Sequence, residues 1–174
     1  VTLGTLALTN GTGSASNYSI SSANFDITQR PLTLVGSKNY DGNTTIQGSQ
    51  ITTFTTIVGS ETVSVAGSGS VSSANVGNAK NLSISGLSLV DNSGQASNYS
   101  IASASSNITQ RPLNLSGSRA YDSTRTASGS DLSFTNIVSG ETLGLTGSGV
   151  LDSPAAGSRT CLLYTSDAAD ESVG

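Results

Sequence analysis

The sequence predicts an all-β protein made of tandem repeats, and three observations favour this fold class. Short runs alternate apolar and polar residues, as in strands with one buried and one solvated face. Thr, Val and Ile dominate these runs, and Gly, Asn, Asp and Ser lie between them as turn formers. No ten-residue run combines helix-forming residues with a period of 3.6. The short, regularly spaced strands favour an immunoglobulin-like β-sandwich for each repeat, with a β-grasp-like sheet as the alternative.

An internal repeat is the strongest pattern in the chain. The segment ITQRPL occurs at residues 27–32 and again at 108–113, a spacing of 81 residues, and NYSI recurs at the same spacing. One residue is lost after Tyr121, so that Phe54 corresponds to Phe134 at a spacing of 80. Several identities in one register indicate repeated copies of a single structural unit.

The repeat boundary is expected at ITQRPL, because proline removes a backbone donor and favours an extended preceding residue. We therefore expect four segments: the C-terminal part of a truncated repeat (1–29), one complete repeat (30–110), the N-terminal part of a truncated repeat (111–160) and a non-native tail (161–174).

The complete repeat is predicted to contain about seven strands, as small sandwiches do. Their expected ranges are 30–36, 44–47, 51–58, 61–66, 70–73, 79–90 (one strand or two) and 98–109. The inward positions of these strands predict a core of Leu32, Leu34, Tyr40, Ile51, Phe54, Ile57, Val63, Val65, Leu82, Ile84, Leu87, Leu89, Tyr99 and Ile101.

Composition excludes several functional classes. The 174 residues include no His and one Cys, which excludes catalytic histidines, His-ligated metals and an intrachain disulfide. Seven Lys and Arg residues are too few to indicate a basic surface that binds nucleic acid. No apolar stretch approaches the ~20 residues that a membrane-spanning helix needs. We expect no cofactor, no metal and no membrane insertion.

A Tyr-Asp-Gly tripeptide at 40–42 returns at 121–123 with Ser123 in place of glycine. Asp-Gly favours a tight turn, and a preceding Tyr can bury its ring while its hydroxyl stays at the rim. Ser123 suggests that this turn does not require a positive φ. The segment before Tyr99 resembles the tyrosine corner of immunoglobulin-type sandwiches. We interpret these residues as a structural repeat motif rather than a ligand loop: Tyr40, Asp41, Gly42, Tyr121, Asp122 and Tyr99.

The acidic residues of the complete repeat do not form the pattern of a calcium site or of a catalytic pair. After Arg30 they are Asp41, Glu61 and Asp91, which show neither the spacing of a calcium loop nor an adjacent pair. Glu61 follows a Gly-Ser turn and is expected to be a solvated loop acid. The sequence therefore predicts no catalytic residues and no enzyme.

The segments RPLTL, KNYDGNTT, IVGSETVSV, GQASNYSI and NITQRPL follow one another in the order of the YDG/MBG-type repeats, which residues 1–160 resemble. Those repeats are tandem modules of very large secreted bacterial proteins, often of the filamentous haemagglutinin type. The resemblance implies a secreted or cell-surface location and no catalytic residues. Residues 161–171 instead resemble a translated sequencing adapter, which implies a metagenomic assembly fragment whose natural sequence ends near Thr160.

The expected function is that of a structural stalk, in which tandem modules space a distal adhesive region from the bacterial cell surface. Its expected partners are neighbouring repeats of the same chain. The alternative is a module that binds glycan or a host protein weakly and gains strength from the avidity of tandem copies.

Overall fold

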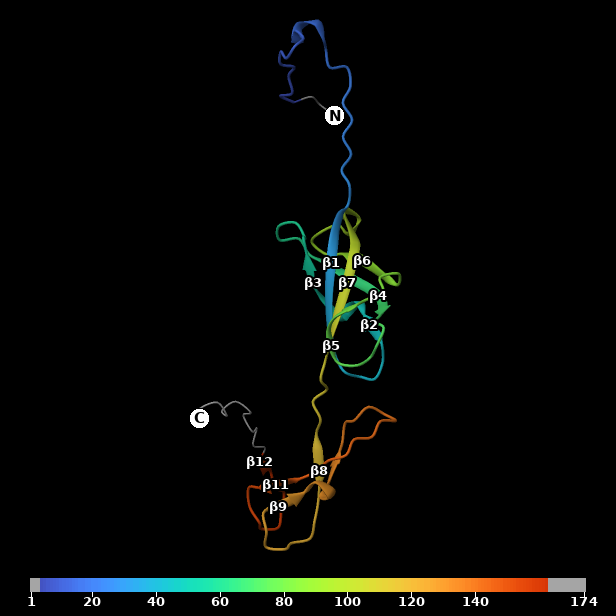
Figure 1. Ribbon diagram of the computed structural model, residues 1–174. Helices are drawn as coiled ribbons and strands as arrows, with labels where there is room; N and C mark the ends of the chain where they lie inside the picture. The colour runs from blue at the N-terminus through green and yellow to red at the C-terminus, as the bar shows by residue number, and fades with distance from the viewer. Residues whose placement is uncertain (1–3, 163–174) are drawn as a thin grey trace, which may run out of the picture. The chain divides into compact units, whose positions relative to one another are not determined.

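The computed structural model describes residues 4–162, in which every regular element is a strand or a short 3₁₀ helix (Figure 1). The strands are β1 (Arg30–Asn39), β2 (Thr45–Gln47), β3 (Ile51–Thr55), β4 (Val63–Ser70), β5 (Gly77–Asn81), β6 (Leu87–Asp91), β7 (Tyr99–Thr109), β8 (Leu115–Gly117), β9 (Thr126–Ser128), β10 (Leu132–Phe134), β11 (Ser148–Leu151) and β12 (Cys161–Leu162). The 3₁₀ helices are η1 (Ala15–Asn17), η2 (Gly48–Gln50), η3 (Ala96–Asn98) and η4 (Gly129–Asp131). The predicted all-β class is confirmed.

Two compact units make up the chain. The first takes in the residues up to Lys38 together with 45–72 and 79–107, and the second takes in 39–44, 73–78 and the residues from 108 onward. Of the tail predicted at 161–174, only Cys161 and Leu162 lie among the described residues, where they pair with β11 as strand β12.

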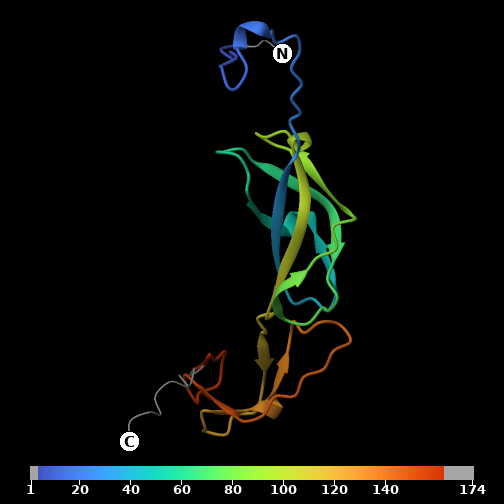
Figure 2. The same ribbon diagram turned by 45° about the horizontal axis from the view of Figure 1, so that its top comes forward.

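Two sheets carry the strands β1 to β7. A four-stranded sheet has the order β3-β1-β7-β5, and a three-stranded sheet has the order β2-β4-β6. The long strands β1 and β7 lie side by side in both ribbon views (Figures 1 and 2). Strand β7 comes from the far end of the repeat, so the sheet joins residues about 70 positions apart, as the hydrogen bond between the Thr33 and Ser103 hydroxyls shows.

Most of the predicted strands are found with shifted ends, but the strand predicted at 70–73 is wrong: Ser70 is the last residue of β4, and Val71 makes only an isolated bridge with Leu82. The range 79–90 splits into β5 and β6, and the range 61–66 begins at Val63 and extends to Ser70. Strand β3 ends at Thr55 rather than at residue 58, because Thr56 adopts a φ of 68°. A positive φ departs from the extended conformation and interrupts the pairing here, although β4 and β5 continue through Gly67 and Ala79 with positive φ.

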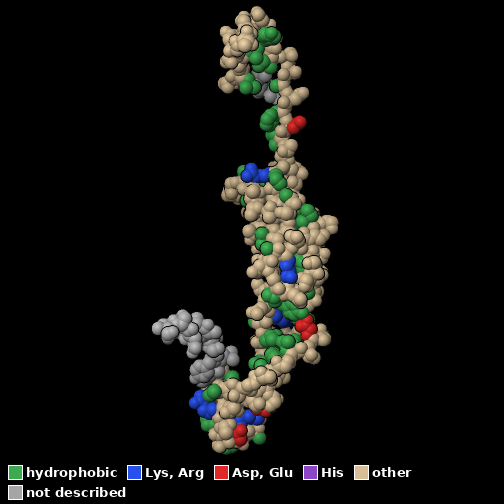
Figure 3. Space-filling view, in the orientation of Figure 1, with side chains coloured by type: hydrophobic (Ala, Val, Ile, Leu, Met, Phe, Trp, Pro, Cys, Tyr) green, Lys and Arg blue, Asp and Glu red, His purple; other side chains and the backbone are tan. Residues whose placement is uncertain are grey.

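The buried apolar residues come from strands of both sheets and from the segments between them. Seven predicted core residues are buried: Leu32, Leu34, Ile51, Val63, Val65, Leu82 and Tyr99. The other seven are only half-buried: Tyr40, Phe54, Ile57, Ile84, Leu87, Leu89 and Ile101. Four apolar residues that the pattern missed complete the core, namely Ile46, Val71, Ala104 and Ile108. Outside the core, Figure 3 shows one face covered mainly by uncharged polar side chains and backbone.

Strands of the second copy pair in the same register as those of the first. Leu34 faces Phe54 in β1 and β3, and their counterparts Leu115 and Phe134 face each other in β8 and β10. The pairing of β2 with β4 recurs in the same way between β9 and β11. The first copy carries a β-bulge between Val35 and Gly36, whereas the second copy pairs without one. The residue that the second copy lacks is therefore the extra residue of the bulge.

Equivalent apolar residues differ sharply in burial. Leu32 and Leu34 are fully buried, whereas their counterparts Leu113 and Leu115 are 37% and 40% exposed. In the first copy β1 lies between β3 and β7, whereas among residues 4–162 β8 pairs only with β10. In that part of the chain the second copy has the same strand without the neighbour that pairs with its other edge.

Candidate functional site

The repeated Tyr-Asp-Gly turn is held by its own aspartate. The Oδ1 atom of Asp41 accepts a hydrogen bond from the backbone N–H of Asn43 at 3.1 Å. Gly42 adopts a φ of 81°, in the left-handed region that glycine enters without steric cost. Tyr40 donates its backbone N–H to the Thr109 carbonyl at 2.9 Å, which anchors the turn at the end of β7. These bonds stabilise the turn and connect it to β7.

The second copy of the turn corrects one prediction. Ser123, in the position of Gly42, also has a positive φ of 62°, so the turn requires the left-handed conformation in both copies. The inference that serine marks a less demanding turn is wrong. The Oδ1 atom of Asp122 accepts bonds from the Thr124 backbone at 2.9 Å and from the Thr124 hydroxyl at 2.8 Å, and these bonds hold the strained residue in place.

Arg119 adds an ion pair to this second turn. Its guanidinium contacts the Asp122 carboxylate and donates a bond to the Thr124 carbonyl at 2.8 Å. The hydrogen bond from Arg119, supported by the two bonds from Thr124, lowers the pKa of Asp122 to about 2. Tyr121 beside this turn is 68% exposed. Its ring therefore does not reach the buried rim position expected from the sequence.

Tyr99 and Glu61 form a part-buried polar pair in the first unit. The Tyr99 ring is 3% exposed, and its hydroxyl donates a hydrogen bond to Oε2 of Glu61. The same hydroxyl oxygen accepts the Val58 backbone N–H at 3.3 Å. The bond to Glu61 is the main reason that the pKa of Tyr99 is raised above 10.0.

This pair was not foreseen in full from the sequence. Tyr99 has the expected packing role, but its hydroxyl reaches residues 38 and 41 positions upstream. A tyrosine corner would instead bond backbone a few residues away. Glu61 is half-buried rather than a solvated loop acid. It packs so closely on Gly94 that a Cβ at residue 94 would lie 2.9 Å from its Oε2 atom. No residue pattern around Glu61 predicts a partner so distant in the chain.

A second tyrosine–glutamate bond occurs in the second unit. The Tyr40 hydroxyl donates to Oε1 of Glu141, and this bond is the main reason that the pKa of Tyr40 is raised. A Cβ on Gly42 would lie 2.8 Å from Cγ1 of Val138, so the turn sits directly on the 138–141 segment. Glu141 is the counterpart of Glu61, yet Tyr40 is not the counterpart of Tyr99.

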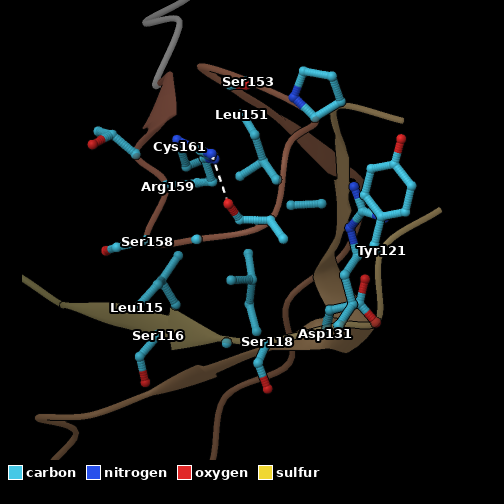
Figure 4. Close-up of a pocket in the computed structure, with 18 of the residues that line it drawn as sticks. Leu115, Ser116, Ser118, Tyr121, Asp131, Leu151, Ser153, Ser158, Arg159 and Cys161 are labelled. Carbon is cyan, nitrogen blue, oxygen red and sulfur yellow. Dashed lines mark hydrogen bonds between the residues drawn. The ribbon is translucent and has the colours of Figure 1, made fainter. Parts of the chain in front are cut away.

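A hollow of about 850 Å³ lies in the second unit, between β8 and the 153–161 segment. In Figure 4, Leu115 and Leu151 face this hollow, with Arg159 and Cys161 on one side and Tyr121 and Asp131 on the other. Three charged side chains line it: Arg159 donates to the Ala155 carbonyl at 2.7 Å, Asp131 accepts from the Ser128 N–H at 3.1 Å, and Arg119 pairs with Asp122 while its Nε is buried without a hydrogen-bond partner. The lining thus combines apolar side chains with the guanidinium groups of Arg119 and Arg159.

Among residues 4–162, no three His, Cys, Asp or Glu side chains gather as metal ligands would. The same part of the chain contains no helix that is long and apolar enough to cross a membrane. The residues predicted as a structural motif lie in two places: Tyr99 contacts Glu61 in the first unit, and the two turns lie in the second.

Comparison with known families gives one match, to the YDG domain over residues 27–108. No curated protein and no solved structure matches the chain at a significant level. The matched range includes strands β1 to β6 and nearly all of β7, with both sheets and the Tyr99–Glu61 pair. Residues 27–108 of this chain are therefore a YDG domain.

Proposed function

We propose that the chain is part of a repetitive stalk of a secreted or surface-exposed bacterial adhesin. The observation that carries this proposal is the shared register of the two copies. Strand pairs β1–β3 and β8–β10 match residue for residue on either side of the bulge, and β2–β4 matches β9–β11. A unit that is rebuilt with the same pairings supports a function that depends on repetition, such as length and cohesion.

The Tyr-Asp-Gly turn supplies a further argument. Through Tyr40 and Gly42, the turn of one sequence copy contacts Glu141 and Val138 of the following copy. A turn that meets the next copy suits modules whose partners are their own neighbours. We propose an immunoglobulin-like sandwich for each module; a four-stranded and a three-stranded sheet that both contribute buried residues support it.

The proposal assigns no enzymatic activity to this chain. The acids of the matched domain have structural partners: Glu61 accepts from Tyr99, and Asp91 accepts the Ala96 N–H at 2.7 Å. We further propose that residues 161–171 derive from a sequencing adapter and lie outside the functional protein.

Two experiments test this function. Sequencing the source DNA across both ends of this stretch should find further copies spaced by about 81 residues, within a gene that encodes an export signal. A gene without further copies would overturn the stalk. The purified chain should show no binding on arrays of glycans and host matrix proteins. Saturable binding there would replace the stalk with the alternative of an avidity-based binding module.

A further inference from the structure

The Tyr-Asp-Gly turn at 40–42 lies beside the segment that connects two copies of the repeat. The Tyr40 backbone N–H donates to the Thr109 carbonyl at 2.9 Å, and the Thr109 hydroxyl donates to Oδ1 of Asn39 at 2.8 Å. Thr109 belongs to the ITQRPL segment, after which the following copy begins. Residues 39–44 accordingly belong to the second unit, together with the residues from 108 onward. The turn is therefore built into the unit that contains the following copy.

The 138–141 loop of the following copy meets this turn. The loop is closed by a bond from the Glu141 N–H to the Val138 carbonyl at 3.0 Å. In the YDG domain the equivalent bond joins Glu61 to Val58, also at 3.0 Å. Because both copies close the loop in the same way, its shape is a property of the repeat.

Tyr40 contacts the loop through its hydroxyl, which donates a hydrogen bond to Oε1 of Glu141. In the YDG domain the equivalent carboxylate, that of Glu61, accepts the Tyr99 hydroxyl through Oε2. A carboxylate accepts hydrogen bonds on both of its oxygens. A glutamate at this position can therefore bind a tyrosine of its own copy and a tyrosine of the preceding copy at the same time.

Gly42 fits this contact by its size. A Cβ at residue 42 would lie 2.8 Å from Cγ1 of Val138, which is closer than real Cβ contacts come. The turn itself does not require glycine, because the equivalent Ser123 adopts a φ of 62° in the second turn. The absence of a side chain at residue 42 is therefore a requirement of the contact with Val138 rather than of the turn.

We propose that the Tyr-Asp-Gly turn is the surface through which one repeat docks on the 138–141 loop of the next repeat, and that the third residue of the turn decides whether it docks. Glycine admits the valine of the loop, and a side chain excludes it. This inference rests on the proposed function, in which the partners of each repeat are its neighbours in the chain. An array that mixes glycine and serine at this position has docked and undocked junctions.

The test is NMR spectroscopy of the full chain, with nuclear Overhauser effects between the side-chain methyl groups of residue 138 and residue 42 as the readout. The wild type should show these effects, and Gly42→Ser should lose them. Adding Val138→Ala to Gly42→Ser should restore them, because Cβ of residue 138 lies 4.0 Å from the added Cβ. Gly147→Ser is the matched control, since Gly147 has a φ of 89° and nothing within 4 Å of an added Cβ. It introduces the same backbone strain without a clash and should keep the effects.

Glu141→Gln tests the same contact without changing the turn. The bond to Glu141 raises the pKa of Tyr40, so this variant should bring that pKa down towards 10.0, as followed by the Cζ chemical shift of labelled tyrosine. The pKa of Tyr99, which is raised by Glu61, is the internal control and should not change. This result stands even if Gly42→Ser fails to fold.

Four outcomes would overturn the docking proposal. They are a wild type without the Overhauser effects, their survival in Gly42→Ser, no restoration by Val138→Ala, and an unchanged Tyr40 pKa in Glu141→Gln. None of them depends on how many copies the source gene contains, which is the test of the stalk. Failure of the docking proposal is therefore distinguishable from failure of the proposed function.

Discussion

The Tyr99 hydroxyl donates a hydrogen bond to the Glu61 carboxylate, and this bond ties the start of β7 to the turn that precedes β4. The Tyr99 ring is buried, and its hydroxyl oxygen also accepts the Val58 N–H. One side chain thus joins the last strand of the YDG domain to a loop of the other sheet.

Tyr99→Phe should lower the urea midpoint of the first unit, because Glu61 and the Val58 N–H lose their partner while the ring remains. Tyr18→Phe is the matched control, since Tyr18 is the counterpart of Tyr99 and is 70% exposed. Circular dichroism at a concentration where the chain is monomeric should show a loss for the first variant only. Equal midpoints for all three chains would mean that the buried bond adds no stability.

The Asp122 turn should show a specific acid dependence. Its folded pKa of about 2 lies below the ordinary 3.8, so the carboxylate stabilises the turn above pH 3.8 and loses this effect as the pH falls towards 2. A carboxyl-carbon NMR titration should give a pKa of about 2 for Asp122. Arg119→Gln should move it towards 3.8, because the largest cause of the shift is removed. An unchanged titration in that variant would contradict the role of the ion pair.

Leu34 and Leu115 form a matched pair of equivalent residues in different surroundings. Leu34→Ala should cost the first unit about 2–5 kcal/mol, the range for leucine in a closed core. Leu115→Ala should cost the second unit clearly less, because Leu115 is already 40% exposed. Hydrogen exchange of amides in β4 and in β10 reports the two free energies of unfolding separately. Equal costs would show that Leu115 is more enclosed than its exposure indicates.

Thr52 is the extra residue of the bulge, because Val35 pairs with Thr53 and Gly36 with Ile51. Its deletion should convert β3 to the geometry of β10. The pairs Leu34–Phe54 and Gly36–Ile51 remain available after the deletion, as their counterparts in the second copy show. We expect a folded chain with nearly unchanged stability. Deletion of Ser64 in β4 is the control, because it shifts Val65 to the opposite face of the strand and should unfold the domain. Two-dimensional amide NMR spectra distinguish the outcomes, and an unfolded Thr52 deletion would show that the bulge is essential.

The two 3₁₀ turns at Ala-Ser-Asn could be predicted from residues nearby in the sequence. The segments 15–17 and 96–98 both read Ala-Ser-Asn and both form a 3₁₀ turn. In each case an upstream side-chain oxygen, of Asn10 or Asp91, accepts the first N–H at 2.7 Å. This geometry recurs although the two segments lie in different surroundings, because every partner is within a few residues. The alternating pattern likewise predicted the strands and half of the core residues.

By itself the sequence determined the repeat, the β class, the Tyr-Asp-Gly turns and the exclusion of histidine chemistry. Only the tertiary structure decided that Glu61 receives the Tyr99 hydroxyl, that Leu34 is buried while Leu115 is exposed, and that Ile27 is solvated while Ile108 is buried. The reason is physical. Turn geometry depends on neighbours along the chain, whereas burial depends on which distant strand lies alongside, and equivalent residues here have different neighbours.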